Sequence, residues 1–201
     1  FKFIFFVIFI NLKINFVNFY LKITIETKII NLVWFIKHKE MSSVVNIYEK
    51  QRLFYDSSKT KDIAFRKRSL IELKNTLLNR EEDILFAIKK DLGKHYYESY
   101  LTEYFMIISE IKKTIKNISG WTRPKRVKSS ILNFPSKDYL LCDPYGCTLQ
   151  ISPWNYPFQL SMATLIGSIA AGNTIILKPS EYAPKTSEII SEIISSVFED
   201  G

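Results

Sequence analysis

The sequence predicts an α/β protein in which N-terminal helices lead into a β-hairpin and then into a parallel sheet. Two observations predict this fold. Apolar residues recur at helical spacing between Val44 and Ile118, and shorter β-branched runs follow after Ser130. From Gly146 the predicted order is strand, helix, strand, helix, which is the opening βαβα of a Rossmann-like parallel sheet.

The composition indicates a soluble globular protein, with 47% hydrophobic and 24% charged residues in a chain of 201. Two cysteines without a Cys/His cluster predict neither a disulfide scaffold nor a metal site, and they fit a reducing, cytoplasmic compartment. The net charge of +8 divides equally between residues 1–40 and the rest. Because no stretch concentrates this charge, no nucleic-acid partner is expected.

Residues 1–40 form a leader rich in Phe, Ile, Asn and Lys, without Ala, Gly or Pro. Its longest apolar run, Phe3–Ile10, is far shorter than the roughly 20 residues of a membrane-spanning helix. These residue types share A/T-rich codons, so the preferred interpretation is untranslated upstream sequence, with Met41 as the start. A membrane or interfacial segment and a genuine strand-rich element stay open, and a membrane partner is expected only through this leader.

The segment 41–143 is predicted to hold the N-terminal helices and the hairpin. Asn79 is expected to cap a helix whose first turn is acidic, and Gly93 is expected to end that helix. A further helix is predicted over residues 97–118, followed by a basic, solvated connector over residues 121–126.

The hairpin is predicted to join strands at 138–143 and 146–151 through an Asp-Pro-Tyr-Gly turn. Cys142 and Cys147 flank this turn without a nearby His. They are therefore interpreted as buried, inert thiols rather than as a nucleophile or metal ligands.

The segment 144–201 is predicted to begin a nucleotide-binding domain. A helix that is apolar on nearly every side should run from Pro157 or Phe158 to about Ala171, and Gly172 should close it. A short strand then follows, and Pro184 is well placed to begin the last amphipathic helix.

Candidate site residues follow both strands of this segment, where ligands bind in open parallel sheets. The first strand leads into ISPWNYPF and the second into LKPSE. A rigid turn could hold the Asn155 amide still, and such a donor suits an oxyanion hole. Lys178 and Glu181 suit the hydroxyl groups of a ribose. The alternatives stay open that Asn155 bonds local backbone groups and that Lys178 to Glu181 is an ordinary solvated loop.

A family resemblance rests on these motifs. The segment PYGCTLQISPWNYPFQLSMATLIGSIAAGNTIILKPSE, Pro144 to Glu181, resembles the N-terminal half of aldehyde dehydrogenases, and PWNYPF with KPSE resembles their class 3, fatty-aldehyde-type branch. The similarity extends more loosely through KDLGK and Leu101-Thr102-Glu103 to about residue 45. It implies an incomplete aldehyde dehydrogenase fold.

The resemblance also implies roles for individual residues. Asn155 matches the asparagine that helps to form the oxyanion hole for the thiohemiacetal. Lys178 and Glu181 match the residues that hold the adenosine ribose of NAD or NADP. Three further positions match residues that line the cofactor: Ile151, Ser152 and Trp154.

Members of this branch oxidise aldehydes to carboxylic acids with NAD or NADP and are typically homodimers. Their pyrophosphate-binding glycine motif, general-base glutamate and nucleophilic cysteine match nothing up to Gly201, and neither Cys142 nor Cys147 matches the nucleophile. The resemblance therefore predicts the N-terminal part of such an enzyme, inactive alone. The alternative is a non-catalytic remnant that acts as a binding or dimerisation module.

Overall fold

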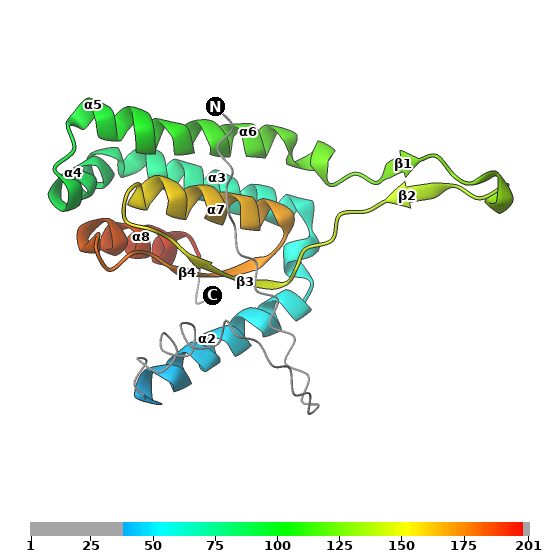
Figure 1. The fold of residues 1–201 in the computed structure, drawn as a ribbon, viewed down its shortest axis with the longest axis horizontal. Helices are drawn as coiled ribbons and strands as arrows, with labels where there is room; N and C mark the ends of the chain where they lie inside the picture. The colour runs from blue at the N-terminus through cyan, green and yellow to red at the C-terminus, as the bar shows by residue number, and fades with distance from the viewer. Residues whose placement is uncertain (1–37, 199–201) are drawn as a thin grey trace, which may run out of the picture.

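The computed structural model describes residues 38–198, and Figure 1 shows their arrangement. The longer helices are α2 (His38–Asp56), α3 (Ile63–Asn79), α4 (Glu81–Leu92), α6 (Phe105–Trp121), α7 (Pro157–Ala171) and α8 (Pro184–Val197). The short helical segments are η1 (Lys59–Lys61), α5 (Tyr96–Ser99), the π-helical turn η2 (Tyr100–Tyr104) and η3 (Ile131–Asn133). The strands are β1 (Lys125–Val127), β2 (Asp138–Leu140), β3 (Cys147–Ile151) and β4 (Thr174–Lys178).

The parallel unit predicted from the sequence is present. Strands β3 and β4 pair in parallel, from Cys147 opposite Thr174 to Ile151 opposite Lys178, and α7 connects them. Helix α7 packs on one face of the pair and α2 on the other (Figure 1). The Thr174 hydroxyl donates to the Gln51 carbonyl of α2 at 3.2 Å, which fastens α2 to the sheet.

Helix α7 begins and ends where the sequence predicts. Pro157 is its first residue, and Gly172 follows its last residue at φ 88°, a left-handed conformation that favours glycine. The N-terminal helices α3 and α6 pack on its apolar surface and leave Phe158 and Met162 fully buried. Helix α8 likewise begins at Pro184.

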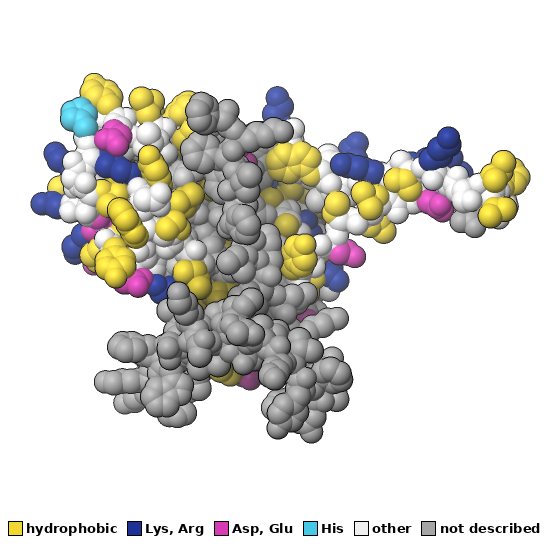
Figure 2. Space-filling view, viewed as in Figure 1, with side chains coloured by type: hydrophobic (Ala, Val, Ile, Leu, Met, Phe, Trp, Pro, Cys, Tyr) yellow, Lys and Arg dark blue, Asp and Glu magenta, His cyan; other side chains and the backbone are white. Residues whose placement is uncertain are grey.

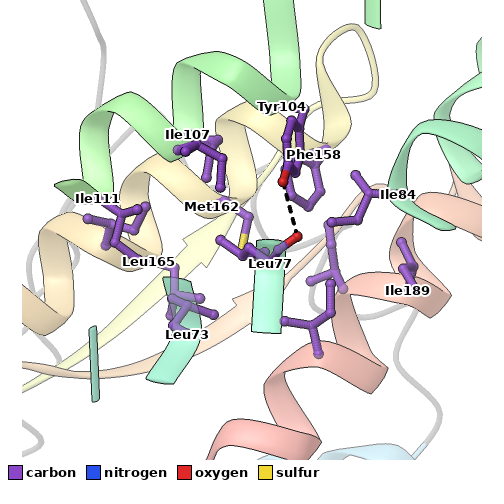
Figure 3. Close-up of a cluster of buried hydrophobic side chains, with 14 of the residues drawn as sticks. Leu73, Leu77, Ile84, Tyr104, Ile107, Ile111, Phe158, Met162, Leu165 and Ile189 are labelled. Atoms are coloured by element: carbon purple, nitrogen blue, oxygen red, sulfur yellow. Dashed lines mark hydrogen bonds between the residues drawn. The ribbon is translucent and has the colours of Figure 1, made fainter. Parts of the chain in front are cut away.

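The core lies between the N-terminal helices and α7, with α8 at one side (Figure 3). Side chains from α3, α4, α6, α7 and α8 meet there, and Figure 3 labels Leu73, Leu77, Ile84, Ile107, Ile111, Phe158, Met162, Leu165 and Ile189 among them. The phenol of Tyr104 lies within this cluster and donates to the Leu77 carbonyl at 3.3 Å. A buried hydroxyl with a partner avoids the cost of an unsatisfied one.

The strands predicted at 138–143 and 146–151 are present as β2 and β3, but the prediction that they pair with each other as a hairpin is wrong. Strand β2 pairs antiparallel with β1, which overlaps the end of the connector predicted over residues 121–126, and not with β3. The ladder of β3 belongs to β4, and this pairing already starts at Gly146, whose carbonyl accepts from the Thr174 N–H at 3.0 Å. The Asp143–Gly146 segment therefore joins two different sheets. The β1–β2 arm projects away from the helical body (Figure 1).

Some of the other local predictions are confirmed and others are wrong. Gly93 ends α4 at φ 65°, as predicted. Asn79 does not cap α4, because α3 continues through it and Arg80 alone separates the two helices. Cys142 is exposed, so its predicted burial is wrong. Cys147 is half-buried, and burial raises the pKa of its thiol, as an inert cysteine requires.

The leader largely lies outside the described residues, which begin at His38. Met41 lies inside α2, three residues after the first residue of that helix. No helix within 38–198 has the length and apolar character needed to cross a membrane. In the same range, no three His, Cys, Asp or Glu side chains gather as ligands for a metal ion.

Candidate active site

The two strand tips lie side by side. The Ser152 N–H, one residue beyond β3, donates to the Lys178 carbonyl at the end of β4, with 3.0 Å between nitrogen and oxygen. The ISPWNYPF and LKPSE segments therefore leave the same edge of the sheet. This is the edge at which open parallel sheets bind ligands.

Lys178 and Glu181 form an ion pair on this edge, with both side chains exposed. The hydrogen bond from the Lys178 ammonium lowers the pKa of the Glu181 carboxyl below its usual range. The pair presents hydrogen-bond donors and acceptors next to each other in solvent. That donor set fits the neighbouring hydroxyl groups of a ribose.

The positions between the two strand tips have different environments. Ile151 and Trp154 are exposed and offer apolar surface at the strand end. Ser152 is buried, and its hydroxyl accepts from the Gln150 side-chain nitrogen at 3.0 Å. The same nitrogen donates to the Leu160 carbonyl at 3.0 Å. The Gln150 side chain therefore links the Ser152 hydroxyl to α7, and that hydroxyl is engaged within the protein.

Asn155 lies in the turn between β3 and α7, with its side chain exposed. Within residues 38–198 its amide group makes no hydrogen bond, and only its backbone carbonyl is engaged, by the Lys94 ammonium at 3.1 Å. The interpretation that this asparagine serves local backbone groups therefore has no contact to support it. Its amide N–H groups are available to a ligand.

Two residues beside this turn were not predicted as site residues. Lys94 follows α4 and Glu103 lies in η2, and their side chains pair at 2.6 Å between Nζ and Oε1. Both fall in segments that carry the family resemblance, yet no local pattern assigns them a role. The available signal was an acidic residue, the only charged one, within the mostly apolar run Tyr100–Ile108.

Glu103 also determines what the start of α7 can bind. Its Oε2 accepts from the backbone N–H groups of Phe158 at 3.1 Å and Gln159 at 3.4 Å. A helix N-terminus attracts anions through such N–H groups. Because the protein's own carboxylate occupies them, these two N–H groups are not available to the phosphates of a nucleotide.

The fold and site define a class: a Rossmann-like parallel unit with an amide and a lysine–glutamate pair at its strand tips, behind a layer of N-terminal helices. The chain belongs to the aldehyde dehydrogenase family, whose model matches residues 34–200. Within that family its relatives include class 3 members.

Among curated relatives, 4,4'-diaponeurosporen-aldehyde dehydrogenase of Staphylococcus aureus is 42% identical over 159 residues, covering 77% of this chain and 35% of that protein. Aldehyde dehydrogenase family 3 member H1 of Arabidopsis thaliana is 34% identical over 154 residues, covering 77% of this chain and 32% of that protein. The chain thus spans about a third of the length of these relatives and matches their N-terminal portion.

Solved structures of aldehyde dehydrogenases share this fold. A substrate-bound state of Staphylococcus aureus AldH superposes with a TM-score of 0.76 at 41% identity, over 78% of this chain and 34% of that one. The succinic semialdehyde dehydrogenase of Streptococcus pyogenes, solved with NADP⁺ as the cofactor, gives 0.67 at 19% identity, over 77% and 33%. The first supports the family and the second the fold.

Proposed function

We propose that this chain is the N-terminal part of an NAD(P)-dependent aldehyde dehydrogenase that oxidises aldehydes to carboxylic acids, with Asn155 as an oxyanion donor. The observation that carries the proposal is the free Asn155 amide in a turn that leaves the same sheet edge as the Lys178–Glu181 pair. An amide N–H donor held beside the aldehyde oxygen stabilises the negative charge that develops on that oxygen.

The other residues bind rather than react. Lys178 and Glu181 would hold the adenosine ribose of NAD or NADP, and the bound cofactor supplies the hydride acceptor. Ile151 and Trp154 would cover its apolar surface, because both are exposed at the strand tip. Ser152 would contribute by fixing the turn, since its hydroxyl is already hydrogen-bonded to Gln150.

The 201-residue chain alone is proposed to lack dehydrogenase activity. Neither of its cysteines matches the family's nucleophile, and burial raises the pKa of the Cys147 thiol, which disfavours the thiolate. The small-molecule aldehyde would be oxidised by a longer protein, a cytoplasmic homodimer in this proposal. Purified chain that reduces NAD⁺ or NADP⁺ with any of a panel of aldehydes would contradict this part.

The role of Asn155 can be tested in a chimera. Residues 41–198 would replace the matching segment of the Staphylococcus aureus relative, which supplies the remainder of an active enzyme. Asn155→Ala should lower kcat by roughly a hundred- to a thousandfold, the effect of deleting one oxyanion-hole donor. Asn117→Ala, on the surface of α6, is the matched control and should retain full activity. An active Asn155→Ala chimera contradicts the proposal.

The second candidate function is a binding or dimerisation module, and one observation favours it. The β1–β2 arm carries three large apolar side chains with little cover: Ile131, Leu132 and Phe134 are 88%, 90% and 85% exposed. Apolar side chains gather at the end of this arm in Figure 2. Exposed apolar clusters are typical of protein interfaces. The same arm would serve the homodimer proposed for the enzyme.

A further inference from the structure

The Lys94–Glu103 pair is the most deeply buried ion pair among the described residues. The Glu103 side chain is 0% exposed and that of Lys94 is 12% exposed, whereas both side chains of every other pair in this range are more than 30% exposed. Removing two charges from water costs free energy that their attraction often does not recover. A buried pair is therefore a weak contributor to stability, and it needs another explanation.

The pair contacts the candidate active-site turn on both sides. Glu103 accepts from the N–H groups of Phe158 and Gln159, at 3.1 and 3.4 Å. The Lys94 ammonium donates to the Asn155 carbonyl at 3.1 Å and lies 4.0 Å from the centroid of the Tyr156 ring. One ion pair thus holds both the residue with the free amide and the first turn of the helix that follows it.

Capping of the N-terminus of α7 explains Glu103 but does not explain why Lys94 pairs with it. Helix α8 offers a comparison within the same chain, since it also begins with proline and lacks a cap of its own. There the Asp91 carboxylate accepts from the N–H groups of Lys185 at 3.1 Å and Thr186 at 2.6 Å. Among residues 38–198 Asp91 forms no ion pair, so a lone carboxylate is sufficient to cap a helix. The contacts of Lys94 lie outside α7, at Asn155 and Tyr156.

We propose that Lys94 and Glu103 are positioning residues that fix the backbone from which the Asn155 amide projects. Lys94 anchors the Asn155 carbonyl, Glu103 anchors the start of α7, and their ion pair joins the two anchors. The backbone of the turn between them then has little freedom to move, so the point from which the Asn155 side chain projects is fixed. The consequence for catalysis rests on the proposed oxyanion role of Asn155, but the ordering of the turn does not.

The ordering is tested in the full 201-residue chain. Lys94→Met keeps the alkyl stem and removes the ammonium, and Lys185→Met is the matched control, because it deletes an exposed lysine–glutamate pair of 2.8 Å on α8. The measurement is the side-chain amide NMR signal of Asn155 in ¹⁵N-labelled protein. Lys94→Met should shift or broaden this signal while Lys185→Met leaves it unchanged. An Asn155 signal that is identical in all three proteins overturns the proposal.

The kinetic consequence is tested in the chimera described above. Lys94→Met should lower kcat by roughly ten- to a hundredfold, the effect of misplacing a catalytic group by about 1 Å, while KM for NAD⁺ stays within about twofold. Lys94→Arg, which keeps the charge, should recover part of kcat. A purely structural role predicts a lower melting temperature with unchanged kcat, and that result overturns the proposal.

The two proposals fail differently. If Asn155→Ala leaves kcat unchanged, the oxyanion role of Asn155 is wrong, and the NMR measurement still decides whether Lys94 orders the turn. If Asn155→Ala is inactive and Lys94→Met behaves as wild type in both measurements, only the positioning role is wrong. Glu103→Gln provides a second variant, expected to raise hydrogen exchange at Phe158 and Gln159 at least about tenfold by weakening the helix cap.

Discussion

Tyr104 is a phenol enclosed by apolar side chains, 2% exposed, with the Leu77 carbonyl as its acceptor. Burial, followed by the nearby Glu81 carboxylate, raises the pKa of Tyr104 well above that of a free tyrosine. Its contribution to stability is thus fully present below about pH 10, the pKa of tyrosine in an unfolded chain, and declines above it.

This pKa shift predicts a pH dependence. Above about pH 10 the unfolded chain releases the Tyr104 proton and the folded chain retains it, so the free energy of unfolding falls by about 1.4 kcal/mol per pH unit from this group. Tyr104→Phe should remove that part of the slope in urea unfolding between about pH 9 and 11. Tyr97→Phe, at an exposed position, is the control and should keep it. Equal slopes in all three proteins would exclude this effect.

Helix α7 has an opposite charge placed at each of its ends. Glu103 binds the N–H groups of its first turn, and the buried Arg66 of α3 donates from Nη1 to the Ala170 carbonyl of its last turn at 3.2 Å. These signs complement the helix dipole. Arg66 also donates from Nη2 to the Lys61 carbonyl at 3.1 Å, which connects α7 to the segment before α3.

Removing the Arg66 hydrogen bonds at the C-terminal end of α7 should destabilise the fold. Arg66→Met keeps much of the volume but leaves the buried Thr60 carbonyl and the part-buried Lys61 and Ala170 carbonyls without their donor, which predicts a loss of about 3 kcal/mol in the free energy of unfolding. Arg66→Lys should recover only part of the lost free energy of unfolding, because one ammonium cannot reproduce the planar, multidentate guanidinium group. Arg68→Met, on the exposed face of the same helix, is the control and should change stability by less than about 0.5 kcal/mol. Chemical denaturation measures all three, and equal losses for Arg66 and Arg68 would contradict this role of Arg66.

The elements that the sequence predicted correctly are those with local signals. Pro157 and Gly172 limit α7 because each residue restricts or permits backbone angles by itself. The partner of β2 was missed because Lys125–Val127 is a basic stretch, and only the commitment of β3 to β4 reveals that it pairs. Lys94 and Glu103 were missed because their contacts are also distant in the sequence. Their partners at Asn155 and Phe158 are more than fifty residues away.

At the scale of the whole molecule, the N-terminal helices and the parallel unit form one body and the β1–β2 arm extends from it (Figure 1). The body buries its apolar residues between α3, α6 and α7. The arm cannot do so, because two paired strands alone have nothing to pack against. The candidate site predicted from the sequence belongs to the body, whereas the arm is free to contact another molecule.

The exposed arm therefore predicts self-association of the chain. Sedimentation equilibrium of wild-type protein should show an average mass that rises towards a dimer with increasing concentration. The triple variant Ile131→Ser, Leu132→Ser and Phe134→Ser should remain a monomer, because it removes the apolar surface at the end of the arm. Leu53→Ser is the matched control, since this leucine of α2 is 71% exposed and lies off the arm. A triple variant that associates as strongly as wild type would show that the arm does not carry the interface.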